Sequence, residues 1–97
     1  FDIMQETLNL TSLSGLAVGS RVNVERSARA NAEIGGHLVS GHVDGTAMVS
    51  AIVPAENNLR ITYRYPDHIG KYLFKKGFVS LNGCSLTIAD IDHARYE

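Results

Sequence analysis

A side-chain period of two, repeated in short segments between turn signals, is the feature of this sequence that most constrains its fold. Residues 21–26 and 59–65 alternate apolar and polar side chains strictly, which is the pattern of half-buried strands. Further strands are predicted over residues 1–6, 37–52, 78–81, 85–90 and 92–97. The strand over 37–52 contains Gly41 and Gly45, and we expect it to be bent or bulged at one of them. Strands do not alternate with long helical patterns, so the predicted fold is all-β, an antiparallel barrel or sandwich.

Turn-forming residues separate these segments. The dipeptide Asn82-Gly83 is a strong signal for a two-residue hairpin turn. Residues 54–58 predict a second hairpin turn. Two other stretches leave alternatives open: residues 7–15 form either a short helical turn or a loop that packs leucines inward, and residues 67–74 form a short amphipathic helix or a turn.

Composition excludes several classes of protein. Nine basic and ten acidic residues leave a formal charge of −1, which disfavours an electrostatic nucleic-acid binder and a polybasic membrane tether. No apolar run approaches the roughly 18 to 20 residues that span a bilayer. The single cysteine, Cys84, has no partner for an internal disulfide and offers no metal-ligand spacing. We therefore expect no membrane segment, and a reducing, cytoplasmic location.

One candidate site is a glycine-rich segment over residues 35–45 that carries two histidines. His37 and His42 are five residues apart, so within a regular strand they would lie on opposite faces. A metal ion shared by the two imidazoles is therefore disfavoured. Each histidine is either a satisfied polar residue near a strand end or part of a binding-site rim, which the neighbouring glycines would also suit.

A second candidate site follows the predicted Asn82-Gly83 turn. Ser85 and Thr87 are two residues apart, so their hydroxyls would face the same side of a strand. Two hydroxyls on one face can hydrogen-bond the carbonyl and ring nitrogens of a heterocycle. The alternative is ordinary decoration of an exposed strand. Cys84 would point the other way, as a small apolar side chain.

Four segments together resemble the riboflavin synthase (alpha chain) family and its non-catalytic relatives, the lumazine proteins. They read FDIMQETL (1–8), GSRVNVERS (19–27), EIGGHLVSGHVDGTA (33–47) and KYLFKKGFVSLNGCSLT (71–87). The resemblance implies two repeats, each a six-stranded antiparallel Greek-key barrel, followed by a helix that assembles a trimer. It maps residues 1–27 onto the last two strands of the first barrel and 36–97 onto the first four strands of the second, with 28–35 as a connector.

The resemblance therefore implies an internal fragment whose strands make up one complete set of six. These strands would close a barrel in permuted order, or by exchanging segments with a partner chain. A homo-oligomer is expected on this view: a trimer in the family, or a dimer for this chain.

The activity that the resemblance implies is a transferase reaction of riboflavin biosynthesis. A four-carbon unit passes from one molecule of 6,7-dimethyl-8-ribityllumazine to a second, giving riboflavin from the acceptor and 5-amino-6-ribitylamino-pyrimidinedione from the donor. No metal or redox cofactor is required. The alternative is a barrel that binds lumazine or flavin without turnover.

The resemblance also assigns site residues. The two catalytic candidates are His42, which would handle a proton or orient the substrate, and Ser85, which would stabilise charge or a bound water. The substrate-binding candidates are Asp2, Met4, Thr7, Gly41, Val43, Lys76 and Thr87.

Overall fold

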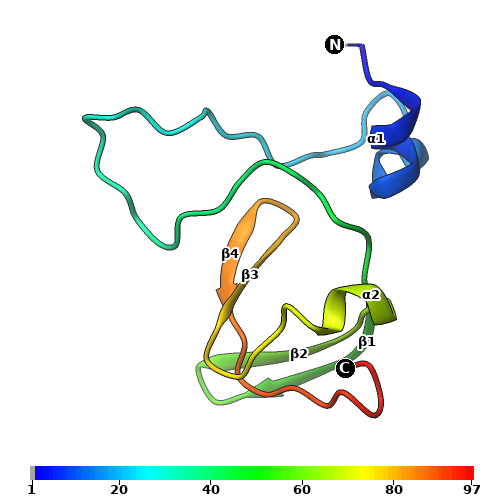
Figure 1. Cartoon of the computed structure of the whole chain (residues 1–97), viewed down its shortest axis with the longest axis vertical. Helices are drawn as coiled ribbons and strands as arrows, with labels where there is room; N and C mark the ends of the chain where they lie inside the picture. Colours follow the sequence, from blue (N-terminus) through cyan, green and yellow to red (C-terminus); the bar gives the residue numbers. More distant parts are fainter. Residues whose placement is uncertain (1) are drawn as a thin grey trace.

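The computed structural model describes residues 2–97, and strand is its main regular structure (Figure 1). Phe1, where the first predicted strand and the first predicted repeat begin, lies outside the described residues. The elements are α1 (Gln5–Leu10), the 3-10 helix η1 (Ser12–Gly15), β1 (Met48–Ala55), β2 (Asn58–Arg64), α2 (Asp67–Gly70), β3 (Phe78–Leu81) and β4 (Cys84–Thr87). A long segment without regular structure joins η1 to β1 and projects to one side of the molecule.

The first hairpin pairs β1 with β2 in antiparallel register, from Met48 opposite Arg64 to Ala55 opposite Asn58. The turn predicted over 54–58 and the strand predicted over 59–65 are confirmed. The long strand predicted over 37–52 is wrong in its start, since β1 begins at Met48. Its predicted bulge at a glycine is also wrong.

The irregularity in β1 falls between Val49 and Ala51, where Ser50 has no opposite residue. The Ser50 hydroxyl donates to the Thr62 carbonyl at 3.3 Å and so bonds to the facing strand there. A bulge needs one extra residue in a conformation that most residues adopt, so no glycine is required.

The second hairpin pairs β3 with β4 through the predicted two-residue turn. Asn82 and Gly83 have φ of 50° and 80°, the positive values of a type I′ turn, which matches the right-handed twist of the flanking strands. The backbone pairing continues past the strands, because Lys76 N–H donates to the Ile88 carbonyl at 2.8 Å and Ile88 N–H to the Gly77 carbonyl at 2.9 Å.

Other segments predicted as strands have different structures. Part of residues 1–6 begins α1, so the helical alternative for 7–15 is the one found. Residues 21–26 have no strand partner, although the Asn23 amide donates to the Asn82 carbonyl at 2.6 Å. β4 ends at Thr87, and 92–97 form a loop closed by reciprocal backbone hydrogen bonds between its two end residues. Alternation defines two faces, but a strand also needs a backbone partner.

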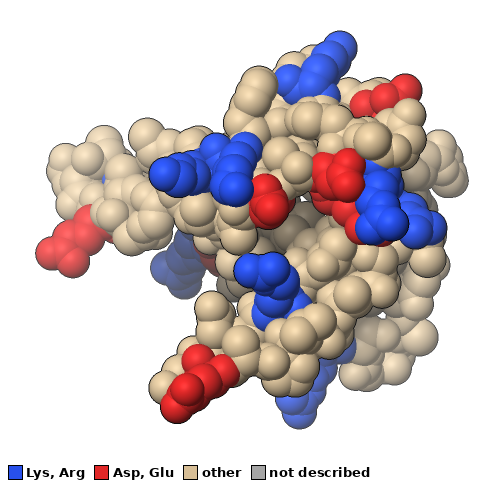
Figure 2. Space-filling model, turned by 90° about the horizontal axis from the view of Figure 1, so that it is seen from below, with Lys and Arg blue, Asp and Glu red and all other residues tan. Residues whose placement is uncertain are grey.

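Within residues 2–97 the strands form two separate two-stranded sheets and close no barrel. The repeat boundaries at 1–27, 28–35 and 36–97 stay a prediction. No helix among residues 2–97 has the length and apolar character needed to cross a membrane. On the face shown in Figure 2, basic and acidic side chains are interspersed.

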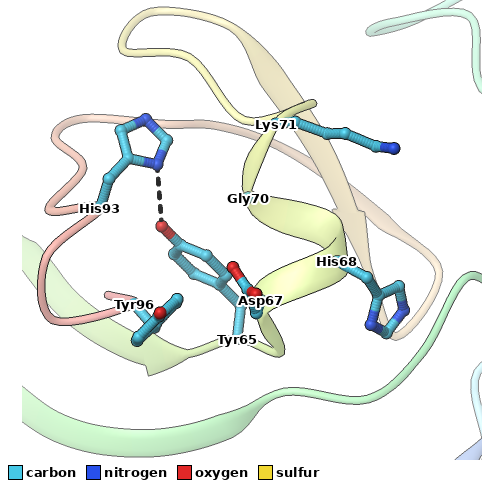
Figure 3. A pocket seen from close by; sticks show the side chains of 7 residues that line it. All are labelled: Tyr65, Asp67, His68, Gly70, Lys71, His93 and Tyr96. Carbon is cyan, nitrogen blue, oxygen red and sulfur yellow. Dashed lines mark hydrogen bonds between the residues drawn. The ribbon is translucent and has the colours of Figure 1, made fainter.

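Tyr65 is the centre of the packing, with 8% of its surface exposed. Its N–H donates to the Tyr96 carbonyl at 2.9 Å, and the two rings meet edge to face with centroids 6.2 Å apart. A Cβ on Gly70 would lie 3.0 Å from the Tyr65 ring, so α2 approaches the ring closely. The Tyr65 hydroxyl lies 3.1 Å from Nδ1 of His93 (Figure 3). Tyr65 thus joins the end of β2, α2 and the C-terminal loop.

Burial raises the pKa of the Tyr65 hydroxyl above its ordinary value, with smaller contributions from Asp92, Tyr96 and Asp67. The unfolded chain, whose tyrosine titrates near 10, therefore loses this proton at lower pH than the folded chain. The contribution of the protonated Tyr65 hydroxyl to the free energy of unfolding is fully present below about pH 10. This contribution is lost as the pH rises through the pKa of Tyr65 in the folded chain.

We expect Tyr65→Phe to lower the free energy of unfolding by about 1 kcal/mol at pH 7, because the hydroxyl loses its bond to His93. The variant should also lose stability less steeply than the wild type above about pH 10. Urea unfolding at both pH values measures this. Tyr72→Phe is the matched control, since Tyr72 is 69% exposed. The argument would be contradicted if the free energy of unfolding fell equally in the wild type and in Tyr65→Phe above pH 10.

Candidate functional site

The β3–β4 hairpin presents one face lined by three hydroxyls and an aromatic ring. Its register places Phe78 opposite Thr87 and Ser80 opposite Ser85. Opposite residues in an antiparallel pair share a face, as do residues two apart. We call the face formed by Phe78, Ser80, Ser85 and Thr87 the hydroxyl face. The prediction that Ser85 and Thr87 face the same side, with Cys84 on the other, is confirmed by this register.

His37 lies over the hydroxyl face. Its imidazole stacks on the Phe78 ring with centroids 4.3 Å apart and planes 7° from parallel. Its Nδ1 lies 2.6 Å from the Ser85 Oγ, at the short end of the range for a hydrogen bond. The tautomer of the imidazole decides which of the two atoms donates. The face therefore combines an imidazole, hydroxyls and a flat ring, which can stack and hydrogen-bond a planar heterocycle.

A glycine in a left-handed conformation precedes His37. Gly36 has φ of 97°, a value that residues with a Cβ adopt only with strain, whereas Gly35 is outside this region. The sequence left His37 as either a satisfied polar residue or part of a binding-site rim. It did not predict the contact with Ser85, because Ser85 lies 48 residues further along the chain. The adjacent Gly35-Gly36 pair was the one local signal of an unusual backbone there.

The structure does not bring His42 to Ser85 by any hydrogen bond among the described residues. The His42 imidazole is exposed, and its backbone N–H donates to the Ser40 hydroxyl at 3.3 Å. Its neighbours Gly41 and Val43 are exposed too. The segment is held instead against α2, where His68 Nε2 donates to the Asp44 carbonyl at 3.2 Å.

The remaining predicted residues divide between two places. Lys76 lies just before β3, with φ of 65°, at the same end of the hairpin as Thr87. Asp2, Met4 and Thr7 lie in or just before α1 and are exposed. Figure 1 shows α1 apart from the β3–β4 hairpin. The structure therefore groups Ser85, Thr87 and Lys76, and leaves the α1 residues in a second location.

A hollow of about 370 Å³ lies around Tyr65 and is lined by none of the hydroxyl-face residues. Its lining residues are Tyr65, Asp67, His68, Gly70, Lys71, His93 and Tyr96 (Figure 3). The Lys71 and His68 side chains extend away from the Tyr65–His93 pair, so the polar groups do not converge on one point. The hollow lies beside the packed ring of Tyr65, and its polar side chains do not point toward a common ligand position. Within residues 2–97 no three His, Cys, Asp or Glu side chains gather as metal ligands.

A family model for the lumazine binding domain matches residues 40–97, which include all of the hydroxyl face. The chain belongs to the lumazine-binding domain family. It is 46% identical over 97 residues to the riboflavin synthase of Escherichia coli (strain K12), covering 99% of this chain and 46% of that protein.

Two further relatives agree with this family assignment. The riboflavin synthase of Actinobacillus pleuropneumoniae is 43% identical over 94% of this chain and 42% of its own length. That of Meyerozyma guilliermondii is 41% identical over 98% of this chain and 40% of its own length. This lumazine-binding family member thus spans less than half the length of the curated relatives it matches.

We expect Gly36→Ala to disturb the stacking of His37, because a Cβ at φ of 97° costs about 1 kcal/mol and favours a different backbone. The measurement is the ring-current shift of the His37 imidazole protons, which the Phe78 ring should move upfield. Gly36→Ala should reduce this shift. Gly35→Ala, with open space around its Cβ, is the matched control and should leave it unchanged. An unaltered shift in Gly36→Ala would refute the role of this glycine.

Proposed function

We propose that this chain binds 6,7-dimethyl-8-ribityllumazine on the hydroxyl face and acts in its dismutation to riboflavin and 5-amino-6-ribitylamino-pyrimidinedione. The observation that carries the proposal is the convergence of Ser85, Thr87 and His37 on one face beside the Phe78 ring. This face lies wholly within the match to the lumazine binding domain. The names of the relatives, riboflavin synthase, supply the reaction class.

The chemistry suits such a face. The reaction passes a four-carbon unit between two identical heterocycles, so the protein has to hold two flat rings together and manage protons. Hydroxyls of Ser85 and Thr87 would bind the polar edge of one ring, with Ser85 stabilising developing charge. His42 would handle a proton or orient the substrate, and Lys76 would favour an anionic substrate.

The second ring requires the other group of residues. We propose that Asp2, Met4 and Thr7 bind it. Gly41 and Val43 would contribute backbone contacts to the substrate. Because the α1 residues lie apart from the hydroxyl face in one chain, a complete site would join the α1 residues of one copy to the hydroxyl face of another. We therefore propose a homo-oligomer in which six-stranded Greek-key barrels are completed by permuted or exchanged segments.

The exposed surface supports this assembly. The chain exposes 8855 Å², whereas a compact monomer of its mass exposes roughly 5,400 Å². Apolar side chains on both strands of the first hairpin contribute, among them Val49, Ile52 and Leu59, each more than half exposed. Covering these side chains with another copy would stabilise the fold. The exposed free thiol of Cys84 suits a reducing compartment such as the cytoplasm.

A second candidate function is binding of lumazine or flavin without turnover. It is favoured by the separation of the two groups of residues, because a single hydroxyl face would still bind one ring. The two functions differ in one measurable product. Riboflavin appears in the first and not in the second.

We expect the chain to bind 6,7-dimethyl-8-ribityllumazine in a fluorescence titration and to form riboflavin, followed by its absorbance. Ser85→Ala should weaken binding about threefold to tenfold, since it removes one hydrogen-bonding hydroxyl. Cys84→Ala is the matched control on the opposite face of the same strand and should bind as the wild type does. His42→Ala should lower turnover. Binding without riboflavin supports the second function, and an absence of binding overturns both.

A further inference from the structure

His37 makes two specific contacts that no assigned role explains. Its ring is held flat against Phe78, and its Nδ1 is 2.6 Å from the Ser85 Oγ. The residues carried over from the family resemblance include His42 and omit His37. Within the described residues, His37 is the histidine that touches the hydroxyl face.

We propose that His37 is the positioning residue for Ser85: it fixes the direction of the Ser85 hydroxyl toward a bound heterocycle. This inference rests on the proposed function, in which Ser85 binds the polar edge of the ring. His37 acts through Ser85 and needs no contact of its own with the ligand.

The physical need for such a residue follows from the serine side chain. A serine hydroxyl carries one donor and two acceptor lone pairs, and its hydrogen rotates to suit its neighbours. A ligand that binds an unfixed hydroxyl must order it first, which weakens binding. Ser85 is half-buried on β4, and its Oγ is hydrogen-bonded to His37 and not to a group on its own strand.

The contact with His37 restricts the directions in which the Ser85 hydroxyl can form further hydrogen bonds. If Nδ1 carries the proton, it donates to Oγ, and the serine O–H is then free to donate to a ligand carbonyl. In the other tautomer the serine donates to Nδ1 and offers its lone pairs to a ligand N–H. In either case the bond to His37 uses one hydrogen-bonding position of the Ser85 Oγ before the ligand binds.

The stack on Phe78 explains how a solvent-exposed imidazole can hold one direction. An exposed side chain normally samples several rotamers, and a lone exposed hydrogen bond orders it weakly. Parallel packing of the two rings, with planes 7° apart, restricts the imidazole to one plane. Within that plane the contact of 2.6 Å with the Ser85 Oγ selects the ring orientation in which Nδ1 faces Ser85. The register of Ser85 against Ser80 fixes the position of the serine on the hairpin.

The test distinguishes the stacking of the His37 ring on Phe78 from the hydrogen bond of its Nδ1 to Ser85. His37→Phe retains a flat ring over Phe78 and removes Nδ1, whereas His37→Asn retains a hydrogen-bonding group near the position of Nδ1 and removes the ring. Riboflavin affinity, measured by fluorescence titration, is compared in these variants, in Ser85→Ala and in the double variant His37→Phe/Ser85→Ala. Urea unfolding of each variant checks that it is folded.

We expect His37→Phe to bind riboflavin about threefold to tenfold more weakly, and His37→Asn to recover part of that loss. The double variant should bind no more weakly than Ser85→Ala alone, because His37 acts through Ser85. The inference is overturned if His37→Phe weakens riboflavin binding by the same factor in the wild type and in Ser85→Ala. It is also overturned if His37→Phe binds riboflavin as tightly as the wild type does.

A measurement without ligand keeps this result distinct from the proposed function. The ¹⁵N shift of His37 Nδ1 should change in Ser85→Ala and stay the same in Thr87→Val, which alters a hydroxyl that does not contact His37. An Nδ1 shift unmoved by Ser85→Ala overturns the inference whatever the ligand does. Failure of the wild type to bind riboflavin and lumazine overturns the proposed function, and with it a role for His37 in that site.

Discussion

The two-residue turn at Asn82 and Gly83 is the constraint on which the candidate site depends. A type I′ turn permits one register between the flanking strands, and a slip by one residue would move every side chain to the opposite face. Ser85 and Thr87 would then exchange places with Cys84 and Leu86. The hydroxyl face exists because two residues accept positive φ at this turn.

Holding His37 over the hydroxyl face costs conformational entropy, because it closes a long loop of the chain. His37 and Ser85 are 48 residues apart, and closing a free loop of that length costs roughly 3 kcal/mol. One stack and one exposed hydrogen bond contribute about 1 kcal/mol each. The bond from His68 to Asp44 changes this balance, because it anchors the segment seven residues after His37 and leaves a short free loop. A shorter loop lowers the cost by about 1.5 to 2 kcal/mol.

Sequence could predict the parts of this arrangement that are local. The Asn-Gly turn, the strand of residues 59–65 and the shared face of Ser85 and Thr87 all follow from neighbours within a few residues. It could not predict which backbone segments pair: residues 21–26 alternate strictly and still form no strand. It could not place His37, because the contact with Ser85 depends on the Asp44 anchor and on the conformation of Gly36.

The same distinction between local and distant contacts bears on how a complete site could form. The hydroxyl face is built by one hairpin and its register, so all four of its residues come from one local segment of the chain. The α1 residues have no such attachment: Thr7 bonds only within its own turn region, through Thr11, among the described residues. The α1 region is ordered by its own hydrogen bonds and is joined to β1 by a long segment without regular structure. It is therefore free to dock on another surface, including that of a second copy of this chain. The hydroxyl face would then determine where the α1 residues dock, through the hydroxyls and the ring that it already presents.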